Sequence, residues 1–202
     1  MIGVNPADVK KLAGTFGAGN EFRRCWASRR PAWSRPSARG RGLFRGRRGR
    51  VGGTGAQREK SVVRAAKARI KPANVPFEQA AVLPVAAAAA FSALVQAGVG
   101  DADVVLVHGA SGGVGSAAVQ IARALGARVV GTASERNHEY LRGLGATPVA
   151  YGARLVDAVR ALPDGLAAVT VVVDVVGSQE TVDQTVELLG ADGLAREGSR
   201  AR

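Results

Sequence analysis

A glycine-rich turn between a predicted strand and a predicted helix is the feature of this 202-residue sequence that most constrains its fold. Residues 104–107 form a short apolar run of strand character, and the turn GASGGVG at residues 109–115 follows it. Apolar residues then recur at helical spacing until Gly126, where a helix is expected to end. A second apolar strand is predicted at residues 128–132, so this stretch is one βαβ unit of about 30 residues.

The turn matches the phosphate-binding pattern G-x-G-x-x-G except at its first position, where alanine replaces glycine. A pyrophosphate lies against backbone N–H groups at the start of a helix, where free donors and the helix dipole favour an anion. Gly112 is then the glycine that the phosphate approaches, and Gly115 lets the helix pack on the strand. We therefore interpret the turn as a dinucleotide site rather than a merely structural turn. The predicted contacts are Ala110, Ser111, Gly112, Gly113, Val114 and Gly115.

Further segments of strand and helix character alternate along the chain. Strands are predicted at residues 149–151 and 168–176, and helices at residues 77–96, 135–144, 155–162 and 179–189. Pro84 is expected to kink or interrupt the first of these helices. The predicted fold class is α/β, a partial doubly wound parallel sheet (Rossmann) of four strands within residues 61–190.

The stretch HGASGGVGSAAVQIARALGARVVGTAS, residues 108–134, resembles the medium-chain dehydrogenase/reductase superfamily, in particular its zinc-free quinone oxidoreductase branch. The resemblance extends through residues 71–98, 141–147 and 171–177. It implies an NADP-binding Rossmann domain. In whole family members, it also implies hydride transfer from NADPH to a quinone or another activated double bond.

The choice between NAD and NADP depends on the end of the second strand. An NAD site usually carries an acid there, about 20 residues beyond the turn, to hold the ribose 2′-hydroxyl. This position falls near Ala133, and the first acid is Glu135. Ser134 and Arg136 could instead donate hydrogen bonds to a 2′-phosphate, so NADP is the predicted cofactor. Ser134 is equally suited to cap the following helix, and this alternative remains open.

The resemblance adds three residues to the predicted cofactor site. It implies that Tyr151 lies by the adenosine phosphate, and that Val176 and Gly177 lie near the nicotinamide ribose. No catalytic acid or base and no metal ligand are assigned, because the cofactor supplies the hydride. Asp174 lies near the carboxyl end of a predicted strand and suits either a ligand contact or a structural hydrogen bond.

The N-terminal third has a different character. Residues 1–22 resemble a remnant of the family's GroES-like substrate domain. Residues 23–50 contain eleven arginines and no lysine or acid, and they carry +11 of the formal net charge of +12. Without apolar periodicity, the segment 23–60 is expected to be disordered. We favour a shifted reading frame over a nucleic-acid-binding arm as its origin.

Composition and chain ends complete the expectations. Cys25 is the only cysteine, so the sequence excludes a disulfide within the chain and a cysteine framework for zinc. No signal peptide or membrane-spanning run is evident, which favours a cytoplasmic protein without a membrane partner. Residues 191–202 depart from the family pattern and are expected to form a disordered tail, as in a truncated, frame-shifted member.

Two functions follow from these features. The first is an NADPH-dependent oxidoreductase with a small-molecule electron acceptor, with cofactor binding but little turnover because much of the substrate domain is missing. The alternative is a non-catalytic remnant or dinucleotide-binding module. A homodimer through a sheet edge is compatible with either function.

Overall fold

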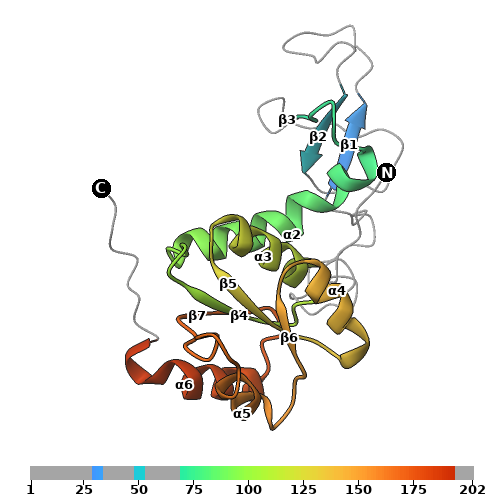
Figure 1. The fold of residues 1–202 in the computed structure, drawn as a ribbon. Helices are drawn as coiled ribbons and strands as arrows, with labels where there is room; N and C mark the ends of the chain where they lie inside the picture. The colour runs from blue at the N-terminus through green and yellow to red at the C-terminus, as the bar shows by residue number, and fades with distance from the viewer. Residues whose placement is uncertain (1–28, 34–47, 53–68, 194–202) are drawn as a thin grey trace, which may run out of the picture. The chain divides into compact units, whose positions relative to one another are not determined.

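The computed structural model describes residues 29–33, 48–52 and 69–193, and the chain divides into two units, residues 1–85 and 86–202. The first unit contains an antiparallel sheet in the order β1-β2-β3 (Figure 1). Its strands are β1 (Arg29–Trp33), β2 (Arg48–Gly52) and β3 (Arg69–Ile70). The predicted remnant at residues 1–22 and residues 194–202 of the predicted tail lie outside the described residues.

Two of these strands fall in the arginine-rich segment that the sequence predicts to be disordered. β1 and β2 pair over five positions, from Arg29 opposite Gly52 to Trp33 opposite Arg48. A backbone ladder needs N–H and C=O groups, which arginine supplies as well as any apolar residue, so missing apolar periodicity did not exclude strands here. The structure thus has strands at Arg29–Trp33 and Arg48–Gly52, and disorder of the segment 23–60 stays a prediction.

The second unit is built on a parallel sheet in the order β6-β5-β4-β7 (Figure 1). Its strands are β4 (Val104–His108), β5 (Arg128–Thr132), β6 (Thr147–Val149) and β7 (Val171–Asp174). α2 (Phe77–Gln96) begins in the first unit and ends in the second. The other helices of the second unit are α3 (Gly113–Ala124), α4 (His138–Gly143), α5 (Leu155–Arg160) and α6 (Gln179–Gly193), with a 3-10 turn η2 (Glu135–Asn137). The predicted four-stranded α/β Rossmann fold is confirmed.

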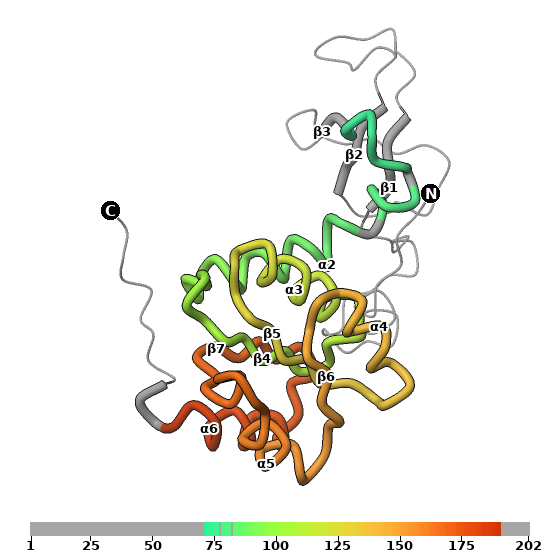
Figure 2. Tube along the Cα trace, viewed as in Figure 1, coloured from blue at the N-terminus to red at the C-terminus, as the bar shows by residue number. Residues whose placement is uncertain are grey.

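The sheet is covered on both faces, and α3 and α5 lie on opposite sides of it in Figure 2. Val105 and Val107 of β4 pack into the core that contains Ala118 and Ala122 of α3. Alternate residues of the same strand, such as Leu106, pack instead into the core that contains Leu155 and Val159 of α5. All five residues of β4 are buried, which is typical of a central strand in a parallel sheet.

Several element boundaries differ from the predicted ones. β6 begins at Thr147 because Val130 of β5 pairs with that residue, and it ends at Val149, so it is displaced by two residues from the prediction. β7 is shorter than predicted at both ends, and at its carboxyl end the Asp174 carboxylate accepts hydrogen bonds from the backbone N–H groups of Val176 and Gly177 and turns the chain. α2 continues through Pro84 without interruption.

The ends of the unit complete its description. α6 includes Gly190, whose φ of 71° and ψ of 171° break helical geometry, and ends at Gly193, three residues into the predicted tail. Among the described strands, β7 pairs with β4 alone, and the predicted dimer through a sheet edge stays a prediction. In the described part of the chain, no helix is long and apolar enough to span a bilayer.

Candidate nucleotide site at the carboxyl edge of the sheet

The glycine-rich turn is held at the carboxyl edge by the neighbouring strand. The N–H of Gly109 donates to Thr132 Oγ1 at 3.0 Å, and the N–H of Ala110 donates to the Thr132 carbonyl at 2.9 Å. Gly109 has a φ of 68°, a left-handed conformation that glycine adopts without a steric cost. Both tethers end on the last residue of β5, so the turn is fixed relative to two strands before α3 begins.

The first turn of α3 presents free donors. Gly112 is the N-cap residue, its N–H donates to the Gly109 carbonyl at 3.0 Å, and its own carbonyl accepts from Ser116 at 2.8 Å. The N–H groups of Gly113 and Val114 have no acceptor among the described residues. Gly112 and Gly113 are exposed, and a Cβ built on Gly113 would have no atom within 4 Å. A phosphate-bearing cofactor fits this arrangement, since anions bind at such a helix start.

The remaining turn residues have packing roles. A Cβ at Gly115 would lie 2.2 Å from the Gly109 carbonyl oxygen and 2.8 Å from the Ala110 Cα, so only glycine lets the helix approach the turn. Ala110 is fully buried, and its methyl group would lie 2.8 Å from a Cβ on Gly131 of β5. Ala110 and Gly115 therefore shape the turn through packing and offer a ligand no side chain.

The end of β5 brings two predicted residues into one hydrogen-bonded group with a third that the sequence did not indicate. Asn137 Nδ2 donates to Ser111 Oγ and to Ser134 Oγ, both at 3.2 Å. Ser134 occupies the N-cap position of η2 through its backbone, and its hydroxyl makes no capping bond. Ala133 is buried, and its N–H donates to the Val149 carbonyl at 3.1 Å. Arg136 is exposed.

The loop after β7 approaches the turn from the other side. A Cβ on Gly109 would lie 2.9 Å from Val176 Cγ2, so the predicted nicotinamide-side residue Val176 is adjacent to the glycine turn. Gly177 follows with a φ of 70° and is exposed. Tyr151, the remaining predicted contact, lies two residues beyond β6 and is 67% exposed. The structure thus gathers the turn, Ser134 and Val176 at one edge, with Tyr151 on the surface beyond β6.

Asp174 fixes the loop after β7. Its carboxylate accepts hydrogen bonds from the Thr181 hydroxyl at 2.7 Å and from the N–H groups of Val176 and Gly177 at 2.8 and 3.0 Å. Burial alone raises the pKa of Asp174, but these hydrogen bonds and the nearby His108 outweigh it and hold the pKa below its ordinary value. Of the two roles that the sequence left open, the observed contacts are those of a structural aspartate.

His108 is a second titratable group at this edge. It pairs in register with Asp174, its side chain is fully buried, and neither ring nitrogen has a hydrogen-bond partner among the described residues. Burial lowers the pKa of His108, and the nearby Asp174 carboxylate opposes that shift only in part. The ring is therefore neutral at pH 7. No cluster of three or more potential metal ligands occurs among the described residues.

A parallel sheet in which a glycine-rich turn joins a strand to a helix with an exposed N-terminus defines a Rossmann-type nucleotide-binding domain. Comparison with known proteins narrows this class. Residues 113–195 match the family of zinc-binding dehydrogenases. An alcohol dehydrogenase superfamily protein from Novosphingobium aromaticivorans is 32% identical, with a TM-score of 0.79 over 93% of this chain and 59% of that one.

Two further relatives have named activities. The quinone oxidoreductase of Thermus thermophilus, solved also with NADPH, is 26% identical, with a TM-score of 0.77 over 93% of this chain and 59% of that one. The trans-enoyl reductase himH of Aspergillus japonicus is 36% identical over 131 residues, which are 60% of this chain and 38% of that protein. The chain therefore spans less than two thirds of the length of these relatives.

The chain belongs to the medium-chain dehydrogenase/reductase superfamily. This confirms the resemblance predicted from the sequence at the level of the superfamily. Membership of the zinc-free branch and the shifted reading frame stay predictions.

Proposed function

We propose that this chain is the cofactor-binding part of an NADPH-dependent oxidoreductase that transfers hydride to a quinone or another activated double bond. The observation that carries the proposal is the start of α3, where Gly112 and Gly113 are exposed and the N–H groups of Gly113 and Val114 lack an acceptor among the described residues. The named activities of the quinone oxidoreductase and the trans-enoyl reductase support the reaction class.

The residues of the carboxyl edge would act by binding and orientation. The free N–H groups of Gly113 and Val114 would hold the pyrophosphate, and Val176 beside Gly109 would form one wall for the nicotinamide ribose. The bound nicotinamide supplies the hydride. Because His108 is buried and Asp174 is engaged in structural hydrogen bonds, neither residue is assigned a proton-transfer role.

The proposed preference for NADP rests on the end of β5. Ala133 places no acid there, Ser134 offers a half-buried hydroxyl, and Arg136 is an exposed cation two residues later. A 2′-phosphate would meet hydrogen-bond donors and a positive charge at this position, whereas an acid would repel it. The contacts proposed from the sequence for Tyr151 and Gly177 are retained in this proposal.

A thermal melt of the purified chain with NADPH, and separately with NADH, tests the proposal. We expect a cooperative transition that NADPH raises more than NADH does, because a ligand that prefers the native state increases its stability. A transition that responds to neither nucleotide would contradict the proposed site. Equal shifts with both would contradict the preference for NADP and leave the dinucleotide site in place.

For the 202-residue chain on its own we propose cofactor binding with little turnover. Steady NADPH-dependent reduction of a quinone by the purified chain would contradict this expectation. The alternative function, a non-catalytic dinucleotide-binding module, predicts the same nucleotide-dependent melt with no reduction of any acceptor.

A further inference from the structure

Asn137, the last residue of η2, joins two parts of the carboxyl edge that are far apart in the sequence. Its Nδ2 atom donates one hydrogen bond to Ser111 in the turn before α3 and another to Ser134 after β5, both at 3.2 Å. Ser111 and Asn137 are 26 residues apart. A single side-chain amide thus fixes the positions of two hydroxyl groups beside the proposed cofactor site.

The direction of these hydrogen bonds determines what the hydroxyl groups can do. An amide NH₂ has two hydrogens to donate, and a serine oxygen that accepts one of them keeps its own O–H hydrogen for another partner. No acceptor for the O–H of Ser111 or Ser134 occurs among the described residues, and both side chains are half-buried. Both hydroxyls are therefore available as donors to an acceptor-rich group.

The surroundings of the pair favour an anion. Ala133 before Ser134 is apolar and buried, and Arg136, directly before Asn137, is an exposed cation. The exposed carboxylates of Glu135 and Glu139 are the opposing charges nearby in the sequence. A phosphate group accepts hydrogen bonds through three oxygens and donates none when fully ionised, so it is complementary to two O–H donors and a guanidinium.

We propose that Asn137 is a positioning residue that directs the Ser111 and Ser134 hydroxyls as a donor pair, and that this pair selects an adenosine ribose phosphorylated at its 2′ position. The inference rests on the proposed dinucleotide function and names a determinant of cofactor choice at that site. Asn137 acts through the two serines and itself makes no contact with the ligand.

Two probes that differ only in the 2′-phosphate test this inference: adenosine 2′,5′-bisphosphate and adenosine 5′-monophosphate. Their affinities for the full chain and for Asn137→Asp are measured by titration calorimetry. A carboxylate accepts hydrogen bonds and donates none, so it would draw both hydroxyl hydrogens towards itself and add a negative charge beside the phosphate. We expect Asn137→Asp to weaken the bisphosphate by about tenfold or more, with the monophosphate changed by less than about threefold.

Matched variants separate positioning from folding. Asn137→Ala removes the shared donor without adding charge, and we expect a smaller loss for the bisphosphate than in Asn137→Asp, of about threefold. Ser134→Ala removes one of the two hydroxyls and should also weaken the bisphosphate alone. If Asn137→Asp does not fold, as judged by the absence of a cooperative melt, Ser134→Ala still tests the inference. A purely structural role for Asn137 would instead weaken both probes by the same factor.

The outcomes distinguish this inference from the proposed function. If the wild-type chain binds neither probe, the proposed function fails and the inference fails with it. If the chain binds both probes but Asn137→Asp changes them equally, or binds the bisphosphate as tightly as wild type, the inference alone is overturned. A selective loss of the bisphosphate in Asn137→Asp and Ser134→Ala supports it.

Discussion

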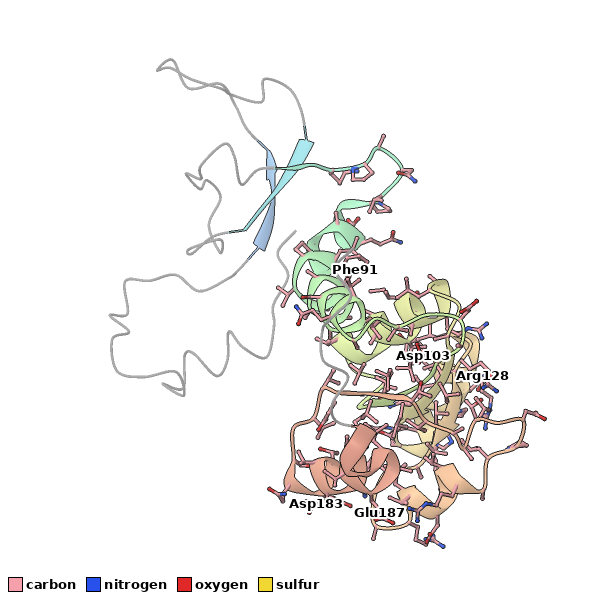
Figure 3. All side chains as sticks on the ribbon, turned by 90° about the vertical axis from the view of Figure 1, so that its left-hand side faces the viewer. Phe91, Asp103, Arg128, Asp183 and Glu187 are labelled. Carbon is pink, nitrogen blue, oxygen red and sulfur yellow. The ribbon has the colours of Figure 1, made fainter. Side chains whose placement is uncertain are left out.

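The two edges of the parallel sheet differ in whether their polar groups are hydrogen-bonded within the protein. At the amino edge, marked by Asp103 and Arg128 in Figure 3, the polar groups satisfy one another. The buried Asp103 carboxylate accepts from the Thr170 hydroxyl at 2.7 Å and from the Gly100 N–H at 2.9 Å, and the Val104 N–H donates to Thr170 Oγ1 at 3.1 Å. The polar groups of this edge therefore hold β4 and β7 together.

The carboxyl edge leaves several polar groups open. The N–H groups of Gly113 and Val114 and the ring nitrogens of His108 have no partner among the described residues, and Val176 is 56% exposed. The contrast indicates that the amino edge contributes mainly to stability and the carboxyl edge mainly to binding, as expected for an open α/β sheet. Substitutions at the two edges should therefore separate folding from nucleotide affinity.

The largest loss of stability is expected at Gly115, which lies at the carboxyl edge but has a packing role. Gly115→Ala would place a Cβ 2.2 Å from the Gly109 carbonyl oxygen and 2.8 Å from the Ala110 Cα, both of which are backbone atoms. We expect a loss of about 3 kcal/mol in the free energy of unfolding, because backbone must shift to relieve the overlap. Denaturant unfolding followed by circular dichroism measures it.

Gly113→Ala is the matched control for this substitution, two residues away on the same helix. Its Cβ meets no atom within 4 Å, and alanine favours a helix over glycine by up to about 1 kcal/mol. The free energy of unfolding should stay equal or rise. Equal destabilisation by both substitutions would show that the close approach at Gly115 is not what makes glycine necessary there.

At the amino edge, Thr170→Val removes the hydroxyl that links Asp103 to Val104. The buried Asp103 carboxylate would lose its 2.7 Å bond, and the Val104 N–H would lose its acceptor. We expect a loss of about 2 kcal/mol in the free energy of unfolding, because the bond involves a charged group. Nucleotide affinity, measured by calorimetry at a temperature where the variant is folded, should not change.

Thr170→Ser retains the hydroxyl and is the control for this substitution. It should lose much less stability than the valine variant. A drop in nucleotide affinity in Thr170→Val, with the fold intact, would contradict the proposed separation of the two edges.

The contrast also shows how far the sequence could predict this molecule. β5 and α2 have the predicted bounds, because β5 is a short apolar run that follows a helix stop and α2 follows Pro76 in an alanine-rich segment. β6 was displaced because its register is set by Val130 on another strand, and no local pattern in Thr-Pro-Val reveals that pairing. The carboxyl end of β7 was predicted two residues too far, because the carboxylate of Asp174 turns the chain there.

Some residues of the candidate site could likewise be predicted from local sequence, whereas others depend on distant contacts. Gly112 and Gly115 were identifiable from local spacing, since a strand, a tight turn and a helix all leave a signal in consecutive residues. The role of Asn137 depends on a contact with Ser111 across 26 residues, and one asparagine in a polar turn carries no motif. The burial of His108 was also missed, because its position after an apolar strand does not reveal which residues cover the ring.

Gly112→Ala tests whether the carboxyl edge contributes to nucleotide binding. Its Cβ would lie 3.3 Å from the Gly109 carbonyl oxygen, a tight contact that a small shift relieves, so the melting temperature should change little. The methyl group would stand where the pyrophosphate approaches the N-cap. We expect NADPH affinity to fall by about tenfold, which corresponds to about 1.4 kcal/mol. Unchanged affinity would contradict the proposed phosphate position.

The smallest expected effect is a dependence of stability on pH that belongs to the carboxyl edge. Burial lowers the pKa of His108 from its ordinary value of 6.5, so below pH 6.5 the unfolded chain binds a proton that the folded chain excludes. The free energy of unfolding should therefore fall as the pH decreases from 6.5 to the folded-state pKa. The slope is at most about 1.4 kcal/mol per pH unit for one proton. The lowered pKa of Asp174 acts in the same direction, but below its ordinary value of 3.8.

His108→Leu isolates the histidine contribution. Both ring nitrogens lack partners among the described residues, so a leucine of similar size should change stability at pH 7.5 by less than about 1 kcal/mol. Melting temperatures of both proteins between pH 7.5 and 5.0 should diverge below pH 6.5, with the wild type falling more steeply. Parallel curves would mean that His108 binds a proton equally well in the folded and unfolded chain. The folded carboxyl edge would then tolerate a charged His108 ring, which contradicts the exclusion of charge expected from its burial.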